Sequence, residues 1–181
     1  AMSNYDSAFL YADRSLQLHS YLEDYNSLTV TLSNFPIRRF ATDEVLFYSQ
    51  GSTVSGYVTT RLIVDSTLYK LYDIDDKRRS VFFKINSSSK NLSFYGSYSG
   101  SNGSLFTGLT TGEMYLIRAE YFARTSNVTA AMDDINTLRK ARWHNMVPYA
   151  DLLASDPNDV LIKVLEERRR ELCFRGVRWT D

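Results

Sequence analysis

The sequence has little of the chemistry that would define a function class. It contains one cysteine, Cys173, so a disulfide framework and a thiolate metal site are both excluded. We expect this thiol to be buried as a small hydrophobic group in a helix. No apolar run approaches the roughly 20 residues that cross a bilayer as a helix. The 21 basic and 21 acidic residues cancel, which disfavours nucleic acid as a partner because no overall positive field attracts phosphate.

Known catalytic motifs are missing as well. The sequence has no nucleophile elbow, no glycine-rich phosphate loop, and no HExxH or paired-cysteine motif, so we expect neither an enzyme nor a bound cofactor. Asp73, Asp75 and Asp76 form an acidic cluster, but an EF-hand starting there would need glycine where Arg78 stands. We therefore expect no metal site, and a turn whose acids pair with the neighbouring cations.

Glutamates near the end of the chain allow a competing interpretation. Glu166, Glu167 and Glu171 lie close in sequence, and a pair of carboxylates can act as acid and base in glycoside hydrolysis. Arg170 and Arg175 stand one helical turn from these acids, which favours ion pairs within a charged structural helix. A glycoside hydrolase is accordingly the weakest of the alternatives.

Helix-forming patterns are abundant, above all in the last third. Apolar residues recur at three- and four-residue steps over residues 5–26, which predicts an amphipathic helix there. The runs GEMYLIRAEYFAR and AAMDDINTLRKAR are separated by a short polar break, which predicts a tetratricopeptide-type helical hairpin over residues 112–142. Asp156 followed by Pro157 marks the start of a C-terminal helix over residues 156–175.

Residues 27–111 lack this helical periodicity. Short β-type runs, among them VFFKI and LSFYGSY, alternate with serine- and glycine-rich stretches. These two runs flank a polar turn at residues 86–91, which predicts a short β-hairpin. The stretch 97–103 is expected to be a mobile surface loop. The fold class is therefore mainly α, with tetratricopeptide-like hairpins and an irregular, loop-rich middle.

Three motifs resemble a known family when they are taken together. They are the EMYLIRAE run at Glu113–Glu120, the pattern of Ala131–Arg139, and ERRREL followed by RGVRWTD within Glu167–Asp181. Their order, spacing and residue types resemble the SusD/RagB family of outer-membrane nutrient-binding lipoproteins. Upstream segments such as Asp43–Phe47 and Phe106–Leu109 look similar too, so the resemblance covers nearly the whole chain.

The resemblance implies a single domain over residues 1–181 that is an internal piece of a longer protein, with its helical hairpins arranged as an α-superhelix. It implies a non-catalytic, surface-exposed lipoprotein of the outer membrane in Bacteroidetes, which binds oligosaccharide and delivers it to a SusC-like TonB-dependent transporter. The lipid anchor of such proteins is expected outside this segment. A peptide-binding member of the family and a tetratricopeptide-like scaffold for a protein partner are the alternatives.

Aromatic side chains on loops are the candidate ligand contacts. Tyrosine, of which there are 13, offers flat apolar area with a polar edge, which suits stacking on sugar rings. Because such aromatics typically form ligand surfaces in the family, we expect ligand contacts at Tyr95, Tyr98, Trp143 and Tyr149, with packing in the core as the competing explanation. The resemblance implies that a second set of residues holds the helices together: Arg118, Glu120, Asn136, Glu167, Arg178 and Trp179.

Overall fold

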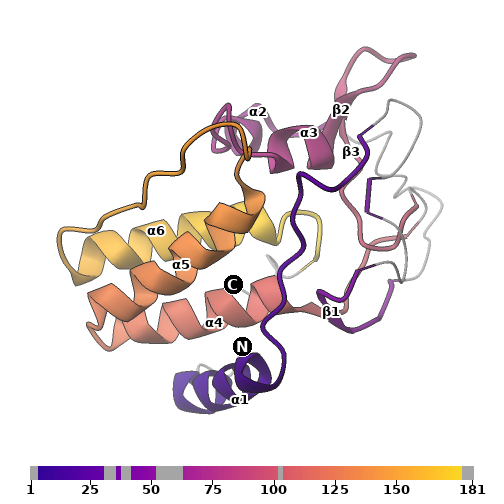
Figure 1. Ribbon diagram of the computed structural model, residues 1–181. Helices are drawn as coiled ribbons and strands as arrows, with labels where there is room; N and C mark the ends of the chain where they lie inside the picture. Colours follow the sequence, from indigo (N-terminus) through magenta and orange to yellow (C-terminus); the bar gives the residue numbers. More distant parts are fainter. Residues whose placement is uncertain (1–3, 31–35, 38–41, 52–62, 102–103, 177–181) are drawn as a thin grey trace.

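The computed structural model describes residues 4–30, 36–37, 42–51, 63–101 and 104–176, and all structural statements below concern these. The helices of this part are α1 (Tyr5–Leu18), α2 (Ser66–Tyr69), α3 (Arg78–Phe82), α4 (Thr111–Arg124), α5 (Val128–Arg142) and α6 (Pro157–Glu171). Its strands are short: β1 (Val45–Phe47), β2 (Phe83–Ile85), β3 (Leu92–Phe94) and β4 (Leu109–Thr110). The fold is mainly helical, as predicted (Figure 1).

Helix α4 lies at the centre of the helical part. Figure 1 shows α1 on one side of it and α5 with α6 on the other. Ala119 of α4 packs with Ala131 of α5 and Val164 of α6 in one apolar cluster. Another side of α4 carries Met114, which packs in a second apolar cluster with Leu16 of α1. Burial on two faces explains why α4 has apolar residues around most of its circumference.

The predicted hairpin of α4 and α5 is present, and local signals set its ends. Thr110 caps α4 because its side chain accepts a hydrogen bond from the Glu113 backbone amide at 3.4 Å. Asn127 caps α5 in the same way, one residue after Ser126 takes a left-handed φ of 62° in the tight turn. Asp156 caps α6 through two backbone amides, also as its sequence indicated.

The first helix is shorter than predicted, because α1 ends at Leu18 and does not continue to Asn26. His19 adopts an extended backbone, and its Nε2 lies 2.7 Å from the carbonyl oxygen of Asp43. Leu22 nevertheless reaches the apolar clusters beside α4. The position of Leu22 fitted the apolar period of a helix, but in the structure a non-helical segment brings its side chain into the core.

The last helix also ends early, at Glu171 instead of Arg175. Phe174 and Gly176 take left-handed φ values of 58° and 76°, so the chain turns away from the helix axis. The predicted pair of Glu171 with Arg175 is therefore wrong. Arg175 pairs instead with Glu113 of α4, at 3.0 Å.

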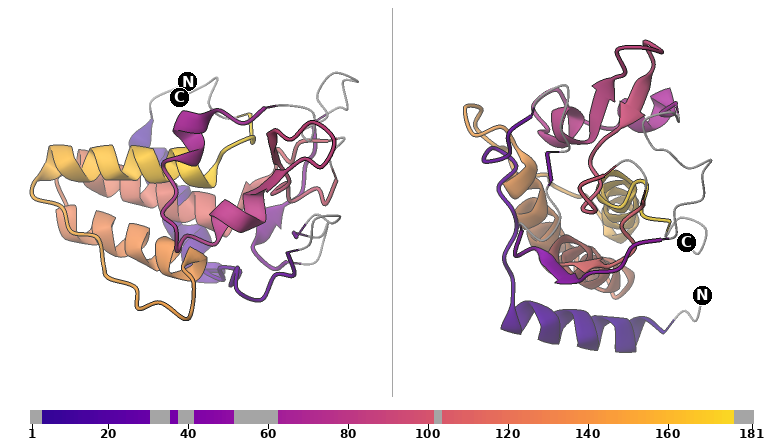
Figure 2. Two further views of the ribbon diagram at one scale, coloured as in Figure 1. Left: turned by 90° about the horizontal axis from the view of Figure 1, so that it is seen from above. Right: turned by 90° about the vertical axis from the view of Figure 1, so that its right-hand side faces the viewer.

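The irregular part gathers beyond one end of the helices, as Figure 2 shows. Strands β2 and β3 pair antiparallel with Phe83 opposite Phe94, which confirms the predicted hairpin. Strands β1 and β4 form a second antiparallel pair. An aromatic core fills this part, with Phe82, Phe94 and Phe106 all buried. Close ring contacts rather than long strands therefore hold the irregular part together.

The prediction of a mobile surface loop at residues 97–103 is wrong for the part of this stretch that the structure describes. Ser97, Tyr98 and Ser99 are buried, and the Ser99 hydroxyl donates a hydrogen bond to the Ser104 carbonyl at 2.8 Å. Residues 102–103 lie outside the described residues. Serines can enter the interior here because their hydroxyls satisfy each other and nearby carbonyls.

Cys173 is buried, as predicted, although it lies just beyond α6 rather than within the helix. The Tyr72 hydroxyl contacts its Sγ at 3.4 Å. Burial raises the pKa of the Cys173 thiol to about 12, so the thiolate is disfavoured at neutral pH. Within the described residues, none of the helices is long and apolar enough to span a membrane.

Candidate functional site

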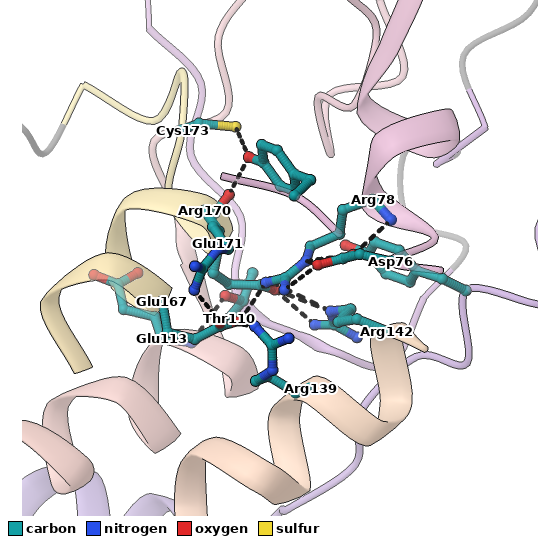
Figure 3. Close-up of polar contacts among 12 residues, drawn as sticks. Asp76, Arg78, Thr110, Glu113, Arg139, Arg142, Glu167, Arg170, Glu171 and Cys173 are labelled. Carbon is teal, nitrogen blue, oxygen red and sulfur yellow. Dashed lines mark hydrogen bonds and ion pairs between the residues drawn. The ribbon is translucent and has the colours of Figure 1, made fainter. Parts of the chain in front are cut away.

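A buried ion-pair network joins α5 and α6 to the irregular part of the chain. Its members, called the ion network below, are Glu44, Asp76, Arg78, Arg139, Arg142, Glu167, Arg170 and Glu171. Figure 3 shows seven of these side chains converging from α5, from α6 and from the start of α3 with the turn before it; Glu44, which directly precedes β1, is not labelled there. Four arginines meet four carboxylates, so the formal charges within the network cancel.

Arg78 is fully buried and contacts three carboxylates. Its Nη2 lies 2.7 Å from Asp76 Oδ2, and its Nη1 donates to Glu171 Oε2 at 2.8 Å. Glu167 Oε1 lies 2.6 Å from Nη1 as an ion pair that lacks hydrogen-bond geometry. Burial alone would lower the pKa of Arg78, but the three carboxylates outweigh it and raise the pKa well above its usual value.

Arg142 forms the second centre of the ion network. It is fully buried, with Nη2 2.6 Å from Glu44 Oε1 and 2.7 Å from Glu171 Oε1. Its Nη1 donates to the Glu23 carbonyl at 2.8 Å. Burial raises the pKa of Glu44 despite this partner, whereas the pKa of Glu171 is lowered because Arg142 and Arg78 together outweigh burial. Of these two carboxylates, Glu171 therefore holds its negative charge more firmly than Glu44 does.

The ion network offers no accessible acid and base for sugar hydrolysis. Glu167 is completely buried, and although burial raises its pKa, Arg78, Arg139 and Arg170 outweigh this and lower it to about 2. A glycosidase needs one carboxyl that keeps its proton near neutral pH and reaches the glycosidic oxygen. Glu167 meets neither condition. The geometry indicates that the ion network stabilises the fold by joining α5 and α6 to the irregular part.

Two further motif residues have defined partners on the helices. Arg118 grips Asp134 of α5 through Nε and Nη2, and its Nη1 donates to Asp13 of α1 at 2.9 Å. Arg118 thus joins three helices. Among the described residues, Glu120 accepts hydrogen bonds only from Arg124, one turn along the same helix, so this contact joins no second element.

Asn136 fastens the loop that follows α5. Its Oδ1 accepts from the Tyr149 hydroxyl at 2.7 Å and from the Leu152 amide at 2.8 Å, and its Nδ2 donates to the Leu152 carbonyl. Three hydrogen bonds from one side chain order a loop without regular structure. Arg178 and Trp179, the remaining motif residues, lie outside the described residues.

The first pair of aromatic candidates lies in or beside the core. Tyr98 is only 4% exposed, and its hydroxyl contacts the Tyr25 hydroxyl at 2.9 Å and donates to Glu44 at 3.1 Å. Tyr95 is half-buried, with Lys84 Nζ 4.9 Å from its ring centroid. The core explanation fits Tyr98, whereas Tyr95 keeps part of its ring at the surface.

The structure brings the second pair of aromatic candidates together. The rings of Trp143 and Tyr149 meet edge to face, with centroids 5.4 Å apart. Both side chains are half-buried. Trp143 Nε1 is buried and has no hydrogen-bond partner among the described residues. Trp143 also forms an isolated β-bridge with Asp76, which places it directly beside the turn before α3.

An open groove of about 540 Å³ lies next to this turn. We call it the α3 groove, and its lining is Tyr69, Ile74, Asp75, Asp76, Lys77, Arg79, Ser80, Phe83 and His144. The volume is within the usual range for small-molecule sites, about 300–1,000 Å³. Aromatic, aliphatic, cationic and acidic side chains therefore share one concave surface of suitable size.

Two polar groups of the α3 groove are held in fixed orientations. Arg79 lies over the Tyr69 ring, with Cζ 4.7 Å from the centroid, and its Nε donates to the Tyr69 hydroxyl at 2.9 Å. His144 Nδ1 accepts from the Met146 amide at 3.2 Å, which requires the ring proton to sit on Nε2. The histidine therefore has a donor at Nε2 that the Met146 contact does not use.

Sequence reasoning missed the α3 groove. It predicted that the acids of the Asp73–Arg79 turn pair with neighbouring cations, and Asp76 does pair with Arg78. Neither Lys77 nor Arg79 forms an ion pair within the described part of the chain. The available signal was three consecutive cations, of which the buried pair with Asp76 uses only Arg78. No group of three or more metal-ligating side chains forms among the described residues.

Residues 57–181, more than half of the chain, match the family model described as SusD family. The chain belongs to the SusD family. The resemblance seen in the sequence is thereby confirmed. A search of curated proteins finds no match for this SusD-family chain.

Solved structures share the fold of this SusD-family chain. A SusD-like carbohydrate binding protein from Bacteroides vulgatus matches with a TM-score of 0.64 and 19% identity, over 96% of this chain and 40% of its own. Surface glycan-binding protein A from Bacteroides uniformis matches with a TM-score of 0.65 and 17% identity, over 99% and 44%. A SusD superfamily protein from Bacteroides thetaiotaomicron gives 0.69 and 18%, over 97% and 44%. The chain thus spans less than half the length of these three proteins.

Proposed function

We propose that this chain is part of a non-catalytic nutrient-binding protein whose ligand is an oligosaccharide. Membership of the SusD family supports the proposal, as do the names of two structural relatives, a carbohydrate binding protein and a surface glycan-binding protein. The ion network adds physical support, because its carboxylates are buried against arginines and unsuited to hydrolysis.

The α3 groove is the observation that carries the proposal. A sugar ring presents C–H groups on its faces and hydroxyls around its rim, so it needs apolar contact beside fixed donors and acceptors. Tyr69 and Ile74 supply apolar area in the groove, and Asp75, Arg79 and His144 supply acceptors and donors. Tyr95, Trp143 and Tyr149 remain proposed contacts for further sugar units, and Tyr98 could take part only after leaving the core.

The wider role follows from the family. We place the protein at the cell surface, on the outer membrane, held by a lipid anchor outside this segment and delivering its ligand to a SusC-like TonB-dependent transporter. Co-purification of such a transporter with the parent protein would support this role. Recovery of the parent protein without a transporter, from cells taking up the glycan, would contradict it.

The proposal is tested by titrating the chain with a panel of oligosaccharides in a calorimeter and analysing the sugars afterwards by chromatography. We expect saturable binding and unaltered sugars. Arg79→Ala should weaken binding at least about tenfold, since a hydrogen bond to a charged group contributes about 1.5–3 kcal/mol. Arg14→Ala, on exposed α1, is the matched control and should bind normally.

Other outcomes would identify the competing functions. Shorter sugars in the chromatogram would indicate a glycoside hydrolase. Binding of peptides but not sugars would indicate a peptide-binding member of the family. A chain that binds neither, but captures a folded protein partner, would be a tetratricopeptide-like scaffold.

A further inference from the structure

We infer that the α3 groove selects an acidic oligosaccharide, with a sugar carboxylate bound between Lys77 and Arg79. The inference rests on the proposed function and specifies the ligand class of the same site. Both cationic side chains line the groove, and neither forms an ion pair within the described part of the chain. Unpaired cations around a concave surface are the electrostatic complement of an anionic ligand.

The charge balance of the groove supports one anionic group per site. Asp76 also lines the groove, but its carboxylate is 2% exposed and gripped by the Arg78 guanidinium through Nε and Nη2. The charge of Asp76 is therefore already neutralised by Arg78. Of the other charged groups in the groove, Lys77 and Arg79 are positive and Asp75 is negative, which leaves one net positive charge for the ligand.

The orientation of Arg79 favours a carboxylate in particular. Its Nε is engaged by the Tyr69 hydroxyl and its plane lies over the Tyr69 ring, so the guanidinium has little freedom to turn away. The Nη1 and Nη2 groups have no hydrogen-bond partner within the described residues, so their donors are available to a ligand. Two parallel N–H groups match the two oxygens of a carboxylate, which a single hydroxyl cannot reproduce.

The other groove residues fit the remainder of an acidic sugar. His144 offers its Nε2–H donor and Asp75 an acceptor, which suits the hydroxyls of the ring. Ile74 lines the groove and is 78% exposed, so its side chain offers apolar contact to the C–H face of a sugar. The groove therefore offers complementary contacts to the carboxylate, the hydroxyls and the apolar face of one acidic sugar.

Binding of a galacturonic acid oligomer is the test, compared with the same oligomer after its carboxyl groups have been reduced to alcohols. We expect the acidic oligomer to bind at least about tenfold more tightly, because only its carboxylate can accept charge-assisted hydrogen bonds from both cations. Lys77→Gln should weaken its binding about tenfold. Arg79→Lys, which keeps the charge and loses the fork, should remove most of the preference.

Arg14→Gln serves as the control, because Arg14 is exposed on α1, at the far side of the molecule from α2 and α3 (Figure 1). Equal binding of both oligomers would overturn the inference and leave the proposed function standing. So would tight acidic binding that neither groove substitution changes, because the site would then lie elsewhere. Absence of binding by any oligosaccharide, neutral or acidic, would overturn both.

Discussion

At Arg142, a fully buried guanidinium is compatible with folding only because carboxylates and a carbonyl surround it. Arg142→Met fills similar space but leaves Glu44 and Glu171 without their shared cation. We expect the free energy of unfolding to fall by about 3–5 kcal/mol, the usual cost of breaking a buried ion pair from one side. Urea denaturation at pH 7 measures this loss.

The matched control for Arg142 is Lys163→Met, which removes the partly exposed pair with Asp159 on α6. Pairs of this kind contribute about 0–1 kcal/mol, because water solvates both partners once they separate. A similar small loss for Arg142→Met would mean that the ion network is open to water in solution.

Glu167 makes the stability of the fold depend on acid pH. Its pKa of about 2 lies below the ordinary 4.5, so the folded state prefers the ionised form more than the unfolded chain does. The resulting stabilisation is complete above about pH 5 and is lost as the pH falls toward 2. It amounts to roughly 3 kcal/mol for a shift of this size.

Glu167→Gln should be less stable at pH 7 and should show a shallower loss of stability between pH 5 and pH 2. Denaturation curves at several pH values, compared with the native sequence, measure the two slopes. The raised pKa of Glu44 acts in the opposite direction, since protonation of this carboxyl is easier in the folded state. Parallel slopes in the two proteins would show that Glu167 is not the responsible group.

At the scale of elements, α4 carries a glycine, Gly112, in its first turn. A Cβ on Gly112 would lie 3.1 Å from both Glu171 Oε1 and Glu44 Oε1, and 3.3 Å from Arg142 Nη2. The ion network therefore approaches the backbone of α4 directly. We expect Gly112→Ala to destabilise the protein by about 1–3 kcal/mol through crowding, despite the better helix propensity of alanine.

Thermal and urea unfolding of Gly112→Ala would measure this effect, with Gly51→Ala as its control. A Cβ on Gly51 meets its nearest atom at 3.6 Å, an ordinary contact, so its stability should change by less than about 0.5 kcal/mol. Stabilisation by Gly112→Ala would show that the side chains of the ion network can shift to accommodate the added methyl group at little cost.

Local signals explain which elements the sequence could predict. The caps at Thr110 and Asp156 act within a few residues, and the period of the flanking apolar residues is set by the helix itself, so α4, α5 and the start of α6 were predictable. The end of α1 was not, because His19 leaves the helix for a contact with Asp43, a residue from another part of the chain.

The ion network and the α3 groove depend on distant partners, and this limited their prediction. Sequence motifs identified Glu167 as structural, yet they paired Glu171 with Arg175 on the same helix. In the structure Glu171 meets Arg78 and Arg142, 93 and 29 residues away. The groove combines Tyr69 and Arg79 with His144 from beyond α5, a proximity that spacing does not reveal.

At the scale of the whole molecule, Glu171 links the helices to the irregular part because it pairs with both Arg78 and Arg142. We expect one cooperative unfolding transition, in which far-UV circular dichroism of the helices and near-UV signals of the aromatic core coincide. Glu171→Gln should separate the two curves, with the aromatic signal lost first. Separate curves in the unsubstituted chain would contradict this coupling.

The sequence distances within the ion network also bear on how the chain reaches its folded state. The α4–α5 hairpin needs only neighbouring residues, whereas Arg142 meets Glu44 across 98 residues and Arg78 meets Glu171 across 93. Closing loops of this length is slow compared with forming local helix contacts. We therefore expect the hairpin to form early and the arginines to stay hydrated until the last segments arrive, so that their neutralisation marks the completion of folding.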